Sequence, residues 1–150
     1  MRMAFGRHKG KTLEIIALKD PDFIRDLLAS EPRTCTQRRV QVEARRLVDT
    51  FDRRAFRVRC VGRDCDRLAS RCTIYKSDVM NPWWWCDTFD RQQYGAGQDR
   101  IRIVRTYQDV LDFSNSFDDP TVVRDLILAL AEAKGLLGAK ETHADIFFNG

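Results

Sequence analysis

The chain has 150 residues, of which 43% are hydrophobic and 32% charged, and its formal net charge at pH 7 is +4. This length suits one compact domain or two very small ones, and the hydrophobic content excludes a wholly disordered chain. No apolar run approaches the roughly 20 residues of a membrane span, and no apolar stretch follows the basic N-terminus as in a secretory signal. We therefore expect a cytoplasmic protein in a reducing compartment, without a membrane partner.

The charges are unevenly distributed along the chain. Residues 1–12 hold four Lys or Arg and no acid, and residues 33–59 hold nine Arg against three acids. Residues 106–150 hold three basic residues against eight acids. A basic front half suits a polyanion, and an acidic tail suits solvent or a protein partner. A plainer interpretation, in which the arginines only solvate helix faces, stays open.

The N-terminal segment predicts a basic turn and then two short helices. The turn is residues 5–11, FGRHKGK, in which two glycines bracket polar residues. Thr12 fits the N-cap of a helix that reaches about Lys19. Asp20 and Pro21 fit the N-cap and the first position of the next helix.

A longer amphipathic helix is predicted after Thr34, which forms a capping-box pattern with Gln37. Apolar residues recur at helical spacing from Val40 to Phe51. The polar side of this helix carries five arginines: Arg38, Arg39, Arg45, Arg46 and Arg53.

The N-terminal pattern resembles a known small module. Residues 5–13, FGRHKGKTL, and residues 20–24, DPDFI, are similar to the module at the C-terminus of exodeoxyribonuclease X, which also occurs alone in microbial and phage proteins. The resemblance covers about residues 3–30. It implies a tiny α+β fold and an accessory role in nucleic-acid transactions. It does not imply catalysis, because the nuclease active site lies in a separate domain whose acidic motifs are absent from this sequence.

The composition of the turn suits a phosphate group. Arg7, Lys9 and Lys11 place positive charge around backbone N–H groups that the glycines expose. His8 lies between two cations, and no paired carboxylate or hydroxyl motif accompanies it in the sequence. We therefore expect a structural or hydrogen-bonding role for His8.

Residues 55–106 predict a small antiparallel sheet with strands at 56–61, 72–75, 83–86 and 101–104, and with turns at Gly62, Asn81-Pro82 and 95–97. Arg57, Arg59 and Arg102 alternate with apolar residues, which predicts a row of arginines on the face opposite the buried one.

Three consecutive tryptophans fall on one of these strands. Trp83 and Trp85 must share one face, and Trp84 must take the other. An exposed Trp84 beside the arginines would form a base-stacking platform for a single strand. In the alternative, all three pack between the helical segments. The arginines considered for the platform are Arg57, Arg59, Arg100, Arg102 and Arg105.

The cysteines of this segment resemble the ligands of a zinc ribbon. Cys60-x4-Cys65 fits the first ligand pair, and Cys86 begins a second pair in which Phe89 stands where a ligand is required.

Three interpretations of the cysteines stay open. Cys72 could supply the fourth thiolate of an all-cysteine Zn²⁺ site, or Asp87 or Asp90 could complete a mixed one. Alternatively the segment holds no metal, and Cys72 faces the core as a small hydrophobe. A zinc ion with four protein ligands would be structural.

Residues 107–150 predict helices that pack on the body of the protein. Thr106-x-x-Asp109 begins a short helix, Asp118-Asp119-Pro120 begins a longer one, and residues 146–148 are apolar enough to dock.

The sequence as a whole predicts an α+β fold with three segments: a module at 1–54, a zinc-ribbon-like β segment at 55–106 and a helical tail at 107–150. The predicted function is a nucleic-acid-binding accessory protein, with DNA or RNA as partner. One alternative is an assembly module whose acidic C-terminal helices bind a protein. Another is a metal-dependent nuclease that uses His8 with Asp64 and Asp66. The candidate nucleic-acid contacts are Arg7, His8, Lys9, Lys11, Arg38, Arg39, Arg45, Arg46, Arg57, Arg59, Arg102 and Trp84.

Overall fold

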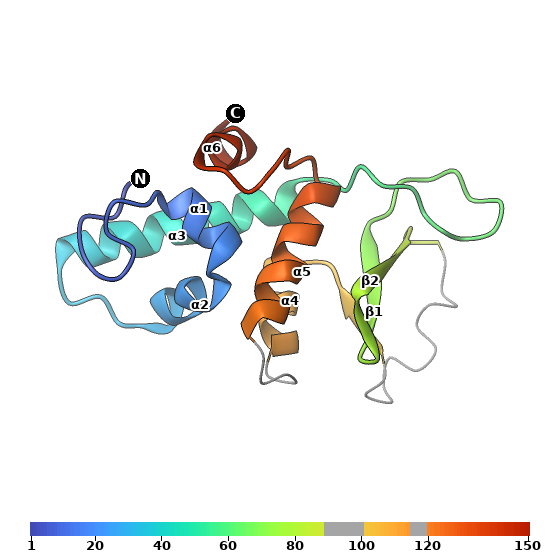
Figure 1. The fold of residues 1–150 in the computed structure, drawn as a ribbon, viewed down its shortest axis with the longest axis horizontal. Helices are drawn as coiled ribbons and strands as arrows, with labels where there is room; N and C mark the ends of the chain where they lie inside the picture. Colours follow the sequence, from blue (N-terminus) through green and yellow to red (C-terminus); the bar gives the residue numbers. More distant parts are fainter. Residues whose placement is uncertain (89–100, 115–119) are drawn as a thin grey trace.

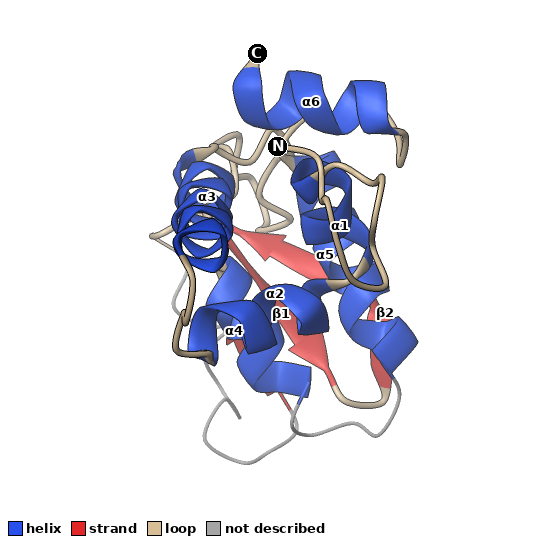
Figure 2. Ribbon diagram, turned by 90° about the vertical axis from the view of Figure 1, so that its left-hand side faces the viewer, coloured by secondary structure: helices blue, strands red, loops and turns tan. Residues whose placement is uncertain are grey.

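A computed structural model describes residues 1–88, 101–114 and 120–150 and confirms an α+β fold (Figure 1). Six helices gather on one side of a small sheet, as the two views show (Figures 1 and 2). In chain order the elements are α1 (Leu13–Lys19), α2 (Pro21–Ala29), α3 (Cys35–Arg53), β1 (Arg71–Tyr75), β2 (Asp78–Trp85), β3 (Ile101–Val104), α4 (Tyr107–Ser114), α5 (Pro120–Ala133) and α6 (Glu141–Asn149).

Local capping signals correctly predicted the starts of α1, α2, α3 and α4, whereas α6 follows Lys140, which makes no side-chain capping hydrogen bond. The side chains of Thr12, Asp20 and Thr34 each accept a hydrogen bond from a backbone N–H in the first turn of α1, α2 and α3. Gln37 reaches back to the N–H of Arg33 at 2.7 Å, one residue before the cap. Before α4, the Asp109 carboxylate accepts the N–H of Thr106 at 3.0 Å, and the Thr106 hydroxyl accepts the N–H of Asp109 at 3.1 Å.

The predicted start of α5 at Asp118-Asp119 lies outside the described residues, as does the turn predicted at 95–97.

The sheet is antiparallel in the order β2-β1-β3. Cys72 pairs with Trp84 on one side and with Val104 on the other, so these three side chains share the face that the helices cover. Thr73 pairs with Trp83 and with Ile103 on the opposite face. The predicted alternation of the tryptophans is therefore confirmed.

The strand predicted at 56–61 is wrong. The backbone there makes only an isolated bridge, between Arg59 and Leu68. The N–H of Arg57 donates instead to the carbonyl of Ala133 at the end of α5, and Phe56 is buried beside Trp84. The N–H groups of Cys60 and Val61 donate to the carbonyls of Arg67 and Trp84, so the backbone donors of this segment reach three different places and form no strand ladder.

One continuous hydrophobic core includes residues from all three predicted segments. Phe51 of α3 packs edge-on against Tyr107 of α4 and Phe147 of α6. The Tyr107 hydroxyl donates to the carbonyl of Ala17 at 2.7 Å, which joins α4 to α1. Among the described residues, no helix combines the length and apolar character that crossing a membrane requires.

Candidate functional sites

The basic turn is closed by its own backbone. Gly6 and Gly10 have φ values of 79° and 86°, which favour glycine. The N–H of Met3 donates to the Lys11 carbonyl, and the N–H of Gly10 donates to the Met3 carbonyl, both at 2.9 Å. The N–H groups of Lys9 and Lys11 are also used within the turn. The expected exposure of the backbone donors is therefore wrong for the amides of Lys9, Gly10 and Lys11.

His8 has a carboxylate partner that the sequence analysis missed. Its Nε2 lies 2.7 Å from Oδ2 of Asp20, and Arg7 Nη2 lies 2.7 Å from the same oxygen. The Asp20 side chain also accepts the N–H of Phe23 as the N-cap of α2. Burial alone would raise the pKa of Asp20, but the hydrogen bonds of His8 and Phe23 and the charge of Arg7 lower it. Asp20 thus fixes the turn to the junction of α1 and α2.

The direction of the hydrogen bond between His8 and Asp20 follows from the chemistry of the carboxylate. An ionised carboxylate only accepts hydrogen bonds, so Nε2 of His8 carries the proton in the 2.7 Å bond to Asp20. This bond is favoured over the longer contact, at 3.3 Å, in which the same nitrogen would accept from Arg7 Nε. Phe23 packs against the imidazole edge with ring centroids 4.8 Å apart. The other ring nitrogen, Nδ1, is buried and has no hydrogen-bond partner within the described structure. In neutral His8 this nitrogen is a free acceptor.

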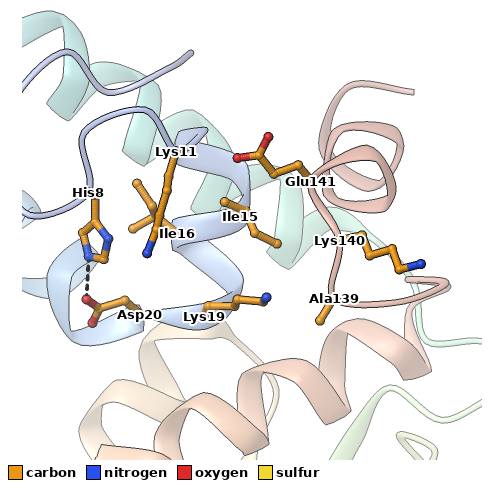
Figure 3. Close-up of a pocket in the computed structure, with 9 residues that line it drawn as sticks. All are labelled: His8, Lys11, Ile15, Ile16, Lys19, Asp20, Ala139, Lys140 and Glu141. Carbon is orange, nitrogen blue, oxygen red and sulfur yellow. Dashed lines mark hydrogen bonds and ion pairs between the residues drawn. The ribbon is translucent and has the colours of Figure 1, made fainter.

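His8 lines a pocket of about 580 Å³ between the turn, α1 and the segment that leads into α6 (Figure 3). Lys11, Ile15 and Lys19 recur every four residues and line one wall. The opposite wall is Ala139 to Glu141.

We expect removal of Asp20 to destabilise the protein. Asp20→Ala deletes a helix N-cap, typically worth about 1 kcal/mol, and leaves a mostly buried imidazole N–H without its acceptor. The free energy of unfolding should fall by about 2 kcal/mol in urea denaturation. Asp26→Ala, on the exposed side of the same helix, is the control and should change it by less than about 0.5 kcal/mol. Equal losses in the two variants would contradict the anchoring role.

The second cluster consists of thiols. The Sγ atoms of Cys60, Cys65 and Cys86 lie within 4.8 Å of one another, and those of Cys65 and Cys86 are 3.7 Å apart. Four ligands at the usual Zn–S distance are separated by about 3.8 Å in a tetrahedron. The Gly62 N–H donates to Cys60 Sγ at 3.3 Å, a contact typical of a thiolate ligand. These three residues could therefore hold a metal ion.

Backbone pairing brings the three thiols together. The N–H of Val61 donates to the Trp84 carbonyl, and the N–H of Ser70 donates to the Trp85 carbonyl, which hold the Cys60–Cys65 loop against the end of β2. Asp64 closes that loop with a φ of 58°. A hydrogen bond with the Thr88 hydroxyl lowers the pKa of Cys86 to about 7, so its thiolate forms readily.

Cys72 does not join the cluster, and its prediction as fourth ligand is wrong for this fold. It is fully buried on the helix-covered face of the sheet, as the core alternative predicted. Burial raises the pKa of its thiol to about 12. Asp87 is engaged elsewhere, because its Oδ1 accepts hydrogen bonds from Ser70 and Arg105 at 2.6 and 2.9 Å. Asp90 and Phe89 lie outside the described residues.

The predicted arginine row on the sheet is also wrong. Arg57 precedes the sheet, and its guanidinium lies against Gly135. Arg59 is exposed in the loop before β1. Arg102 pairs with Ile74 and so shares the helix-covered face, because alternation relative to Ile101 does not fix which face is outward. Arg100 lies outside the described residues.

Trp84 is not the exposed tryptophan. It is half-buried and packs on Phe56 with ring centroids 5.1 Å apart, whereas Trp83 on the other face is 49% exposed. The stacking platform predicted at Trp84 is therefore absent at that position.

The arginines of α3 divide into two groups. Arg38, Arg39 and Arg45 are exposed. Arg46 instead donates to both carboxylate oxygens of Glu43, at 3.0 and 2.6 Å, and to Asn149. Arg38, Arg39 and Arg45 in the first part of the helix, and Arg53 at its end, which is also exposed, are therefore the ones available to a ligand.

The acids of the C-terminal helices mostly have local partners. Glu141 accepts from Arg2 and from the N–H of Thr12, and Asp112, Asp125 and Asp145 each contact a neighbour on their own helix. The nuclease constellation is also not assembled. The loop between α3 and β1, which contains Asp64 and Asp66, lies at the sheet end of the molecule, and the N-terminal turn, which contains His8, lies at the opposite end (Figure 1).

The chain matches no protein-family model, no curated protein and no solved structure. The resemblance of its first thirty residues to the exodeoxyribonuclease X module stays a prediction.

Proposed function

We propose that the protein is a nucleic-acid-binding accessory protein that contacts phosphates through the basic turn and the first half of α3. The observation that carries this proposal is a set of exposed cations without acidic partners within the described structure: Lys9, Lys11, Lys19, Arg38, Arg39 and Arg45. The turn and the first half of α3 lie together at the end of the molecule opposite the sheet (Figures 1 and 2). Clustered Lys and Arg of this kind are the usual electrostatic footprint of nucleic-acid binding.

Salt dependence tests this function. Each phosphate neutralised by Lys or Arg releases counterions, so affinity for a DNA or RNA duplex or single strand should fall steeply between about 50 and 200 mM salt. Arg38→Ala/Arg39→Ala should weaken binding at low salt and reduce the slope of log K against log salt by about 1 to 2. Fluorescence anisotropy on labelled oligonucleotides measures both quantities.

Arg53→Ala/Arg124→Ala removes the same charge from the far end of α3 and from α5, and serves as the control. It should leave the salt slope nearly unchanged. Absence of binding to all four nucleic acids at low salt would overturn the proposed function.

We also propose that Cys60, Cys65 and Cys86 hold a Zn²⁺ ion. The near-tetrahedral spacing of Cys65 and Cys86 and the N–H donor to Cys60 support this assignment. Among the described residues only these three thiols gather, so they would fill three of the four positions of a tetrahedral zinc ion. The ion would fasten the Cys60–Cys65 loop to β2 and so contribute to stability.

A further inference from the structure

We infer that the pocket lined by His8, Lys11 and Lys19 binds the terminal phosphate of a nucleic-acid strand, an inference that rests on the proposed function. The chemical group it would select is a phosphomonoester. This group carries more negative charge than an internal phosphodiester and can hold a P–OH proton that the diester lacks. The pocket has three features that suit this group: its charge, its unpaired imidazole nitrogen and its size.

The pocket is electropositive despite two acids in its lining. Asp20 is already neutralised by Arg7 and His8, and Glu141 by Arg2. The ammonium groups of Lys11 and Lys19 form no ion pair with any described residue. Figure 3 shows both side chains along the α1 wall and Lys140 on the far wall, with its side chain directed away from His8. A phosphomonoester carries close to two negative charges at neutral pH, against one for a diester, and so matches two free ammonium groups better.

The imidazole supplies the second element of selectivity. Its Nδ1 is buried and unpaired, and Figure 3 shows it on the side of the ring that faces Lys11. A buried polar atom without a partner costs free energy that a bound ligand can recover. A phosphomonoester that keeps one proton can donate its P–OH to this nitrogen when the imidazole is neutral. An internal phosphodiester has no such proton and only accepts.

The size and lining of the pocket fit the end of a strand. A volume of about 580 Å³ accommodates a nucleotide-sized group. The side chains of Ile15, Ile16 and Ala139 add apolar surface for a sugar or base. The Ala139–Glu141 segment forms the wall opposite the turn.

Oligonucleotides that differ only at their ends test the inference. Fluorescence anisotropy compares 5′-phosphate with 5′-hydroxyl ends, and 3′-phosphate with 3′-hydroxyl ends, with AMP and adenosine as competitors. At least one phosphorylated end should bind about tenfold more tightly than its hydroxyl counterpart. AMP should compete for the protein, and adenosine should not.

Lys11→Met/Lys19→Met should abolish the preference for the phosphorylated end. Because both lysines belong to the basic surface, the variant should also bind the hydroxyl-ended strand more weakly, so the ratio of the two affinities is the quantity compared. Lys76→Met/Arg124→Met removes the same charge on the β1–β2 turn and on α5, and should keep the preference. All four positions are exposed or at the surface of their element, and circular dichroism checks that each variant is folded.

The outcomes separate the two proposals. Equal affinity for phosphorylated and hydroxyl ends, with salt-dependent binding intact, overturns the inference and leaves the proposed function standing. Binding of AMP without binding of any oligonucleotide supports the phosphomonoester pocket and overturns the nucleic-acid function. No binding of AMP or of any strand overturns both.

Discussion

Replacing Cys86 with serine is expected to abolish stoichiometric zinc binding. The hydroxyl is a poor ligand, and the remaining thiols of Cys60 and Cys65 form only one edge of the site. Loss of a partner that only orients a ligand costs 10- to 100-fold in metal affinity. Loss of a ligand should therefore weaken zinc binding by more than about a hundredfold. Cys60→Ser and Cys65→Ser should have the same effect.

Two other cysteines provide the controls. Cys35 is an exposed free thiol at the start of α3, and Cys35→Ser should retain the metal. Cys72→Ser should also retain it, although a buried hydroxyl will lower the stability of the fold. Elemental analysis of the purified variants and the charge-transfer absorption of their Co²⁺ forms measure the effect. Zinc loss in Cys72→Ser but not in Cys86→Ser would contradict the three-thiol site.

The metal should also contribute to stability. A zinc ion that binds only the folded protein stabilises it by mass action. Chelation should lower the thermal midpoint of the wild type and leave that of Cys86→Ser unchanged. Chelation that lowers both equally would show that the ion lies elsewhere.

Features fixed by neighbouring residues were predictable from the sequence. The caps at Thr12, Asp20 and Thr34 satisfy backbone groups three residues away, so the chemistry is local and the prediction holds. The alternation of Trp83, Trp84 and Trp85 is equally local, because successive side chains on a strand must point to opposite faces.

Features that depend on the packing of distant segments were not predictable. Alternation does not reveal which face of the sheet the helices cover, so Trp84 and Arg102 were assigned to the wrong side. His8 and Asp20 meet because α1 folds back beside the turn, and a separation of twelve residues carries no motif. The spacing Lys11, Ile15, Lys19 was the one signal that could have indicated the lysine wall.

The metal cluster combines a feature that is local in the sequence with one that depends on the packing of distant segments. Cys60-x4-Cys65 is a local loop, and the sequence identified it together with Cys86. The position of Cys72 depended on strand register, which places it in the core. Its selection as fourth ligand therefore failed.

Lys134 is a buried cation that the sequence analysis passed over. Its side chain is only 1% exposed, and its Nζ donates to the Phe51 carbonyl at 2.6 Å near the end of α3. The ammonium also lies 4.6 and 4.7 Å from the ring centroids of Phe51 and Phe56. Burial lowers the pKa of Lys134 to about 8, and the nearby charge of Asp52 partly opposes this.

This lysine should make stability depend on pH in the alkaline range. Its folded pKa of about 8 lies below the usual value of 10.5, so between these values the unfolded chain binds more protons than the folded one. The free energy of unfolding attributable to Lys134 therefore rises with pH from about 8 to 10.5, by about 3 kcal/mol in total. Below pH 8 the full cost of the buried charge is present.

Lys134→Met should remove that rise, because methionine fills a similar volume and does not titrate. The Phe51 carbonyl keeps the N–H of Arg54 as a donor at 3.3 Å, so the variant should be at least as stable as the wild type at pH 7. Urea denaturation at pH 7 and pH 10 gives the change in the free energy of unfolding with pH for each protein. Groups that titrate in both proteins contribute equally, so their effect cancels in the comparison. Lys76→Met, at an exposed site, should follow the wild-type profile. Parallel profiles for wild type and Lys134→Met would show instead that Lys134 keeps its ordinary pKa in the fold, with the two rings and the Phe51 carbonyl compensating its burial.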